Sequence, residues 1–239
     1  MTLNRVSING LVRLAGLVYV PRERRSHVCA VVSHGFTASK ESVDLLSSYL
    51  AARGYPALSF DFRGHKLGGS EGDLNQASDT LDDLRAAASV ALERFKVDRC
   101  VLVGHSMGAM VSLLVGAEME DCAGIAAITT GMQPSRGFEQ PVGQAMLSQR
   151  SDYISGAEPM TLLKQFDELV ADWPGLVDKP ALLVGAKSDV VIKPSRVKEL
   201  AERAGTQVEY AEIEGSHLEA PSRARGVVAN WLDAMFGDL

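Results

Sequence analysis

Short hydrophobic runs alternate along the chain with longer segments in which apolar and polar residues recur at helical spacing. Short apolar runs are typical of buried strands, whereas apolar residues three and four positions apart indicate amphipathic helices. The pattern predicts strands at residues 28–33, 55–60, 99–103, 124–130, 180–185 and 207–213, and helices at 44–53, 79–95, 109–115, 193–203 and 223–236. Strands that alternate with helices form a mostly parallel sheet with helices on both faces, so we expect an α/β fold.

The first twenty residues depart from this alternation. Apolar residues at 6–8 and 11–20 flank Asn9-Gly10, a dipeptide typical of a two-residue hairpin turn. We therefore expect an antiparallel hairpin at one edge of the sheet.

Residues 131–178 interrupt the pattern a second time, because they contain no convincing strand. The glycines and prolines at its start predict a loop, and the pattern at residues 159–170 predicts a helix. An insertion of this length between strands usually carries function, so we expect a lid within one domain that spans residues 1–239. Its apolar residues could line an acyl pocket or could simply attach the insertion to the domain: Met132, Phe138, Met146, Leu147, Tyr153, Phe166 and Trp173.

Composition narrows the classes of function. The 239 residues are 46% hydrophobic and carry a formal net charge of -6, which argues against a nucleic-acid-binding protein. Cys29, Cys100 and Cys122 are odd in number and widely spaced, so they fit neither a disulfide framework nor a zinc site. The N-terminus does not resemble a signal peptide and no run of apolar residues is long enough to span a membrane. We expect buried thiols in a cytoplasmic protein.

Residues 104–108 read Gly-His-Ser-Met-Gly and lie between a predicted strand and a predicted helix. This is the setting of the nucleophile elbow, G-x-S-x-G, a sharp turn that exposes a serine hydroxyl. The two glycines let the strand and the helix approach closely, and the helix N-terminus directs its amide groups toward developing negative charge. Ser106 is therefore the candidate nucleophile.

A serine hydroxyl needs a base within hydrogen-bond reach, and the base needs a group that orients it. His217 follows the last predicted strand, in a loop that can deliver an imidazole to the nucleophile. His105 is constrained inside the elbow, and His27 belongs to an edge-like strand. His34 and His65 follow strands and could line the same site. We expect His217 to be the base.

For the orienting acid, Asp189 is the best placed. It follows the predicted strand at 180–185, and the loops at the carboxyl ends of parallel strands gather at one rim of the sheet. We expect its carboxylate to accept the imidazole N–H. The alternative interpretation is that Asp189 is an ordinary solvated aspartate in a turn. Asp167 and Asp178 are rivals, but neither immediately follows a strand.

The chain order Ser106, Asp189, His217 is the order of nucleophile, acid and histidine in α/β-hydrolases. The chain resembles that family over nearly its whole length, through residues 33–36, 61–65 and 104–108 and through the loops of Asp189 and His217. The resemblance implies an α/β-hydrolase fold with a catalytic triad and no metal or organic cofactor.

The resemblance also implies an oxyanion hole made by two backbone amides. These are the N–H of Phe36, which follows the strand at 28–33, and the N–H of Met107, directly after the nucleophile. Such donors contribute roughly 3–4 kcal/mol each to transition-state stabilisation.

One segment departs from the family. Residues 61–65, Asp-Phe-Arg-Gly-His, followed by Ser70, resemble the family's D-x-R-G-H-G-x-S stretch, but residues 66–69 replace the usual short glycine link. The longer loop lies at the edge of the expected site. We expect Asp61 and Arg63 to tie loops together.

Within the family, the modest insertion and residues 34–41 resemble small carboxylesterases, including cinnamoyl and feruloyl esterases and serine-aminopeptidase-like lipases. The implied activity is hydrolysis of a small-molecule carboxylic ester through an acyl-serine intermediate. Three alternatives stay open: a thioesterase or acyltransferase, a carbon–carbon bond hydrolase or lyase, and a ligand-binding receptor on the same fold. The sequence fixes neither the acyl group nor the alcohol, and a homodimer is an open alternative to a monomer.

Overall fold

The computed structural model describes residues 1–171, 173–176 and 179–237. Within these ranges one sheet has the strand order β1-β2-β4-β3-β5-β6-β7-β8. The strands are β1 (Thr2–Asn9), β2 (Arg13–Val20), β3 (Val28–Ser33), β4 (Ala57–Phe60), β5 (Arg99–His105), β6 (Cys122–Ile128), β7 (Ala181–Ala186) and β8 (Val208–Ile213). β2 pairs antiparallel with β1 and β4, and all other pairings are parallel. The predicted mostly parallel sheet is confirmed.

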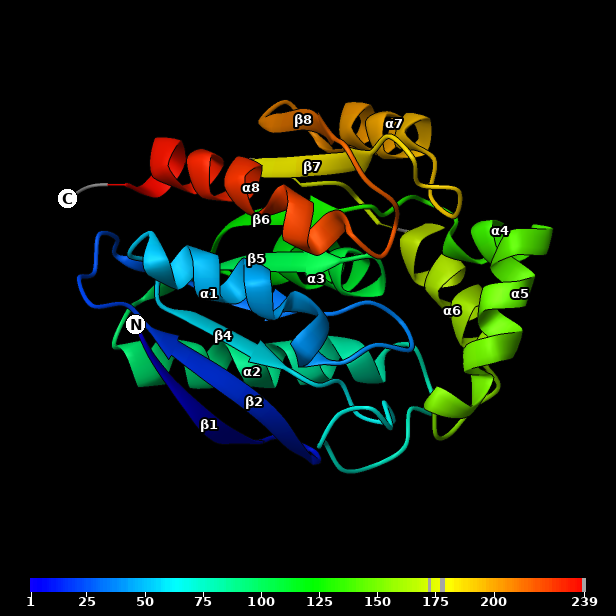
Figure 1. The fold of residues 1–239 in the computed structure, drawn as a ribbon, viewed down its shortest axis with the longest axis horizontal. Helices are drawn as coiled ribbons and strands as arrows, with labels where there is room; N and C mark the ends of the chain where they lie inside the picture. The colour runs from blue at the N-terminus through cyan, green and yellow to red at the C-terminus, as the bar shows by residue number, and fades with distance from the viewer. Residues whose placement is uncertain (172, 177–178, 238–239) are drawn as a thin grey trace.

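Helices cover both faces of this sheet (Figure 1). One face carries α1 (Asp44–Ala52) and α8 (Ala220–Phe236), and the other carries α2 (Asp79–Phe95), α3 (Met107–Glu118) and α7 (Pro194–Ala204). A short 3-10 turn, η1 (Lys40–Val43), precedes α1. In α2 the residues Leu84, Ala87, Ala88 and Ala91 are fully buried. Their spacing places them on one helical face, which explains the amphipathic pattern.

The central strands are buried on both sides. All six residues of β3 are buried. Val31 and Leu102 pack into the core layer beneath α2 and α3, while their neighbours Val32 and Val103 pack into the layer beneath α1 and α8. Successive side chains of a strand point to opposite faces, so a strand with both faces covered is a continuous apolar run in the sequence.

The hairpin closes through residues 10–12 and not through a two-residue turn at Asn9-Gly10. Ile8 pairs with Leu14, and both side chains are buried. A two-residue turn at Asn9-Gly10 would pair Ile8 with Leu11 instead of Leu14. This odd shift of three positions would place Arg13 on the buried face, because side chains alternate along a strand. The predicted antiparallel edge is therefore right, but the predicted turn is wrong, since burial of Leu14 sets the register.

The insertion at residues 131–178 is more helical than its sequence indicates. Its described part forms α4 (Pro134–Phe138), α5 (Pro141–Arg150), the 3-10 turn η2 (Ser151–Tyr153) and α6 (Pro159–Ala171). Only α6 is predicted by the sequence. Pro134 and Pro141, which the sequence pattern assigns to loops, lie in the first turn of α4 and α5. A backbone N–H at that position has no acceptor within the helix, so proline is tolerated there. Figure 1 shows α4, α5 and α6 gathered at one end of the sheet.

Cys29, Cys100 and Cys122 lie on the neighbouring strands β3, β5 and β6, where all three are free and buried. Burial raises the pKa of the Cys29 thiol to about 12, so it stays protonated. None of the helices in the described ranges combines the length and the apolarity that crossing a bilayer requires.

Candidate active site

The nucleophile elbow is the turn between β5 and α3. Ser106 stands between them with φ 54° and ψ −114°, a left-handed conformation that costs a non-glycine residue roughly 1–3 kcal/mol. A Cβ on Gly104 would lie 2.3 Å from backbone atoms of Gly108, and a Cβ on Gly108 would lie 2.6 Å from the carbonyl oxygens of Ser33 and His34. Both positions therefore require glycine, and the tight packing holds the serine in its strained position.

Three side chains that are far apart in the sequence form one hydrogen-bonded line. His217 Nε2 lies 3.0 Å from Ser106 Oγ, and His217 Nδ1 lies 2.7 Å from Asp189 Oδ2. The carboxylate accepts Nδ1–H, which leaves Nε2 free to accept the serine proton. The structure thus brings together the three residues expected to form the triad.

Asp189 is itself fixed by the loop after β7. Its Oδ1 accepts the backbone N–H groups of Val191 and Ile192, each at 2.8 Å. Asp189 is 4% exposed and His217 is 7% exposed. The carboxylate is therefore held in one orientation and shielded from water, and both conditions strengthen its hold on the imidazole.

His105 is a support for His217 rather than a base. Its Nε2–H donates to the backbone oxygen of His217 at 2.9 Å, and the two rings lie 5.0 Å apart between centroids. Burial holds the pKa of His105 well below its usual value, so the ring is neutral. The residue beside the nucleophile thereby anchors the loop that carries the base.

The two amides expected to form the oxyanion hole belong to residues that line a cavity at Ser106. Met107 opens α3, so its N–H is among the first-turn donors that an α-helix leaves without an internal acceptor. Phe36 follows β3 and lines both cavities that reach Ser106. The next residue, Thr37, has φ 60°, which marks a sharp turn of the backbone directly after Phe36.

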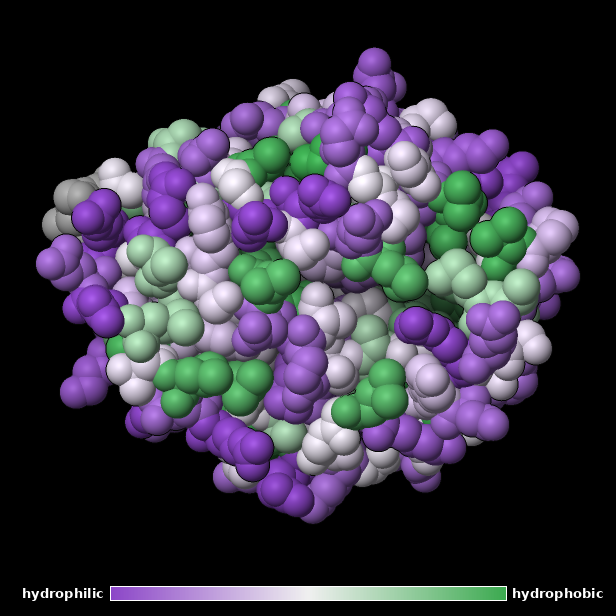
Figure 2. All heavy atoms as spheres, in the orientation of Figure 1, coloured by the Kyte–Doolittle hydropathy of each residue, from purple (hydrophilic) through white to green (hydrophobic). Residues whose placement is uncertain are grey.

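Two cavities meet at Ser106. The larger has a volume of about 220 Å³ and is lined by residues that include Phe36, Thr37, Ser106, Phe138, Met146, Leu147, Arg150, His217 and Leu218. The smaller has a volume of about 20 Å³ and is lined by residues that include Phe36, Ser106, Met107, Met110, Phe138, Leu163, Phe166 and Ile192. Figure 2 shows hydrophobic residues around a hollow in this face of the molecule, beside the helices of the insertion. Four of the apolar residues singled out in the insertion therefore line cavities at the serine.

Residues 24–166, more than half of the chain, match the family model described as "Serine aminopeptidase, S33". The chain belongs to the serine aminopeptidase S33 family. Its predicted α/β-hydrolase fold is also found in solved structures. The Pyrococcus furiosus esterase Pf2001 aligns with 99% of this chain and 94% of its own, at 22% identity and a TM-score of 0.77. Est1E from Butyrivibrio proteoclasticus, solved with ferulic acid bound, aligns with 96% of this chain and 98% of its own, at 17% identity and a TM-score of 0.78.

Curated relatives match a shorter stretch of this S33-family chain. Cutinase est2 of Thermobifida alba is 27% identical over 107 residues, which are 44% of this chain and 35% of the relative. Cutinase 1 of Thermobifida cellulosilytica is 24% identical over 127 residues, which are 50% of this chain and 45% of the relative. The chain thus spans less than half the length of these cutinases.

His34 and His65 do not line the cavity over Ser106 in this S33-family structure, contrary to expectation. His34 Nδ1–H donates to the Gly35 oxygen at 2.8 Å, and its Nε2 accepts the N–H of Phe62 at 3.1 Å. His65 Nδ1–H donates to the Arg63 oxygen at 3.0 Å. Both rings are buried and pack edge to face, so they brace loops beside the site.

Burial lowers the pKa of His34 to about 4 and that of His65 to about 3. Both rings are neutral when folded, whereas they take up protons below about pH 6.5 when the chain unfolds. The unfolded state therefore binds more protons between pH 6.5 and about 4, and stability falls as the pH falls through that window.

We expect the free energy of unfolding to drop between pH 7 and pH 5 by on the order of 1–2 kcal/mol for each buried histidine. Urea unfolding at pH 7, 6 and 5 measures this slope. His65→Gln should flatten the slope, while His27→Gln, at an exposed position, is the matched control. A wild-type slope of zero, or equal slopes for wild type and His65→Gln, would contradict the assignment.

Asp61 and Arg63 tie loops together, as expected. Asp61 accepts the backbone N–H of Lys40 at 2.7 Å, the Lys40 ammonium at 2.6 Å and the N–H of Gly69 at 2.8 Å. A Cβ on Gly68 would lie 2.3 Å from Asp61 Cγ, so the longer loop needs a glycine there. The loop that departs from the family pattern is thus fastened to the Asp61 carboxylate.

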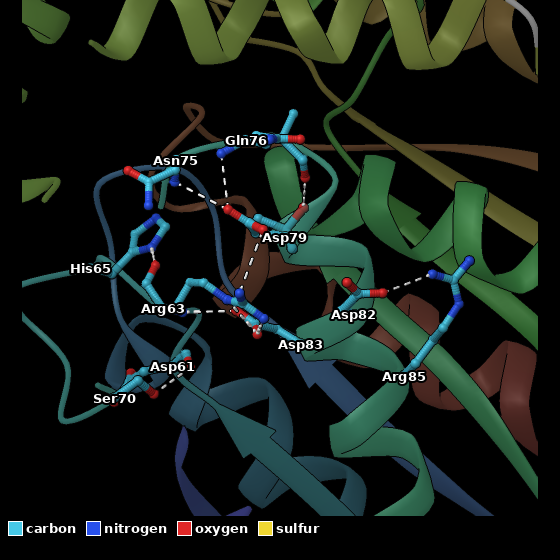
Figure 3. Close-up of polar contacts among 12 residues, drawn as sticks. Asp61, Arg63, His65, Ser70, Asn75, Gln76, Asp79, Asp82, Asp83 and Arg85 are labelled. Carbon is cyan, nitrogen blue, oxygen red and sulfur yellow. Dashed lines mark hydrogen bonds and ion pairs between the residues drawn. The ribbon is translucent and has the colours of Figure 1, made fainter. Parts of the chain in front are cut away.

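Arg63 is fastened to α2 by two aspartates that are not among the residues predicted from the sequence. Figure 3 shows its guanidinium between Asp79 and Asp83. Asp83 Oδ1 accepts Arg63 Nε–H at 2.9 Å and an Nη2–H at 2.6 Å, and Asp83 Oδ2 accepts the backbone N–H of Arg63 at 2.9 Å. Asp79 lies 3.5 Å from the other end of the guanidinium. Acidic residues one turn apart on a predicted helix were the available signal.

The rival acids lie elsewhere. Asp167 on α6 accepts the backbone N–H of Ser135 at 3.1 Å and its hydroxyl at 2.5 Å, so it holds α4 against α6. Asp178 lies outside the described residues. Arg150, which is not among the residues predicted from the sequence, lines the larger cavity.

Proposed function

We propose that this protein hydrolyses carboxylic esters through an acyl intermediate on Ser106. The observation that carries the proposal is the continuous line of hydrogen bonds from Asp189 through His217 to Ser106, at 2.7 and 3.0 Å. A nucleophile, a base within reach of it and a group that orients the base are the parts that acyl transfer needs. The names of the relatives, esterases and cutinases, agree with this reaction class.

In the first half-reaction Ser106 Oγ attacks the ester carbonyl carbon while its proton passes to His217 Nε2. The Phe36 and Met107 amides would hold the tetrahedral oxyanion, each contributing roughly 3–4 kcal/mol. Collapse of this intermediate breaks the bond to the alcohol oxygen, which takes the proton from His217. The acyl group is left on Ser106.

In the second half-reaction water gives a proton to His217 and attacks the acyl carbon. The second tetrahedral intermediate expels Ser106 Oγ, which recovers its proton from His217. The Asp189 carboxylate accepts Nδ1–H and stabilises the imidazolium in both halves. The carboxylic acid leaves and the enzyme is restored.

The two cavities would bind the two halves of an ester separately. His217 must reach the leaving oxygen, and His217 lines only the larger cavity, so the alcohol half belongs there. The acyl half then belongs in the smaller cavity. About 20 Å³ is roughly the room of one water-sized group, which suits the methyl of an acetyl group.

A fluorophosphonate probe together with an ester panel tests the proposed function. We expect the probe to label Ser106 and nitrophenyl acetate to be hydrolysed faster than acetyl-CoA. Faster turnover of acyl-CoA would make the protein a thioesterase. Absence of labelling and of all ester turnover would overturn the proposal and leave a ligand receptor or a carbon–carbon bond enzyme.

Acyl length gives a further prediction. Activity on nitrophenyl esters should fall by at least 10-fold from acetate to octanoate, because the small cavity has no room for the longer chain. Phe138→Ala, which removes a wall shared by both cavities, should raise octanoate turnover relative to acetate by about 10-fold. Met132→Ala, in the same insertion but not among the residues that line either cavity, is the control. Equal acetate-to-octanoate ratios in wild type and Phe138→Ala would contradict the assignment.

A further inference from the structure

The larger cavity contains one permanently charged side chain. Its lining is otherwise backbone, apolar side chains, hydroxyls and the two histidines His105 and His217, and Arg150 is the single arginine or lysine. No carboxylate lines this cavity among the described residues. The lining of this cavity therefore carries one fixed positive charge on a protein of net charge -6.

Arg150 is the last residue of α5, and its guanidinium lies 5.9 Å from the centre of the Tyr153 ring. Several other arginines of this fold form ion pairs, such as Arg63 with Asp83, Arg53 with Asp233 and Arg85 with Glu118. Within the described ranges Arg150 forms no such ion pair, so stacking on Tyr153 leaves its N–H groups available to a ligand. A guanidinium placed in this way suits the planar, bidentate binding of a carboxylate or phosphate.

The position of Arg150 also specifies which half of the substrate it would meet. It lines the cavity that His217 lines, and it does not line the small cavity. The alcohol oxygen departs on the side of His217, because the imidazole must protonate it. An anion bound by Arg150 therefore belongs to the alcohol half.

We infer that Arg150 is a specificity residue, and that the preferred substrates are short-chain esters of alcohols that carry a carboxylate or a phosphate. The inference rests on the proposed ester hydrolysis and adds the substrate class. The charge pairing acts in a partly enclosed apolar site, where it is screened less than at an open surface.

Matched esters test this inference. 3-Acetoxybenzoate and its methyl ester present the same acetyl group on the same ring and differ in one negative charge. For the phosphate, the anionic ester is 3-acetoxyphenyl phosphate and the neutral ester is 3-acetoxyphenyl methyl ether. For each pair the measured quantity is the ratio of kcat/KM for the anionic ester to kcat/KM for the neutral one, so that leaving-group differences cancel when variants are compared.

Arg150→Met keeps the unbranched apolar stem of the side chain and removes the guanidinium charge. We expect this variant to lower the anionic-to-neutral ratio by about 10–100-fold for at least one of the two anions, through KM more than kcat. Arg150→Lys should restore part of the ratio, and added salt should lower it in wild type but not in Arg150→Met. The pair of esters whose anionic-to-neutral ratio falls more in Arg150→Met identifies carboxylate or phosphate as the preferred anion.

Arg225→Met is the control, because Arg225 also lies over a tyrosine ring, at 5.7 Å from Tyr49, but does not line the cavity. Circular dichroism and thermal melts of each variant show whether it is folded. Ratios that stay the same in wild type and Arg150→Met, with both neutral esters hydrolysed, would overturn this inference alone. Failure of wild type to hydrolyse any of the four esters would overturn the proposed function as well.

Discussion

Replacing Ser106 with alanine should lower ester turnover by on the order of 10⁵-fold while leaving the free energy of unfolding within about 0.5 kcal/mol of wild type. The loss is large because the hydroxyl is the atom that becomes acylated, and neither His217 nor the amides can replace it. Stability is expected to change little because alanine occupies the same backbone conformation with the same φ of 54°. Steady-state hydrolysis of nitrophenyl acetate and urea unfolding measure the two quantities.

Ser222→Ala is the matched control for this experiment. Ser222 lies on α8, and its hydroxyl donates to the Glu219 oxygen at 2.9 Å, away from the cavities. We expect it to keep wild-type turnover. Turnover in Ser106→Ala within 10-fold of wild type would show that another group is the nucleophile, and the mechanism proposed above would then be wrong.

The largest expected effect on stability comes from Asp83. The side chains of Arg63 and Asp83 are 8% and 1% exposed, so the pair is shielded from water. Desolvation raises the pKa of the Asp83 carboxyl and its hydrogen bonds from Arg63 lower it, so the charged form depends on the guanidinium beside it. Asp83→Ala would leave a buried cation facing an apolar side chain, and we expect it to destabilise the fold by about 3–5 kcal/mol. Asp79, at 3.5 Å, compensates only in part.

Asp82→Ala provides the comparison, because Asp82 is the neighbouring residue on α2 and its side chain is 46% exposed, at 3.3 Å from Arg85. An exposed pair of this kind contributes about 0–1 kcal/mol. Urea unfolding of the two variants at pH 7 gives the difference directly. Equal destabilisation by Asp83→Ala and Asp82→Ala would mean that burial of the Arg63 pair is unimportant to stability.

Much of the site could be read from local sequence because the elbow is a local structure. Gly104 and Gly108 are required by contacts within the strand, the turn and the helix, and their spacing is visible in the sequence. The positions of His217 and Asp189 after predicted strands also carry information, because parallel strands deliver their following loops to one rim. These features depend on chain order and periodicity.

Other features depend on contacts that no local pattern records. His34 and His65 also follow strands, yet they face the protein interior and brace loops, while His217 faces Ser106. The difference is set by the direction of each loop after its strand. Arg150 had no distinguishing signal either, since an arginine at a helix end is common. Only the packing of α5 in the insertion at the end of the sheet makes it line the same cavity as Ser106 (Figure 1).

By itself, the sequence determined the alternation of strands and helices, the strained serine turn and the order of the residues that surround it, because periodicity and steric requirements act over a few neighbouring residues. Tertiary structure alone decided the hairpin register, the helical nature of the insertion and the side chains that reach the cavity. Those outcomes follow from burying Leu14, from packing α4, α5 and α6 at the end of the sheet, and from strand register that fixes distances between residues far apart in the chain.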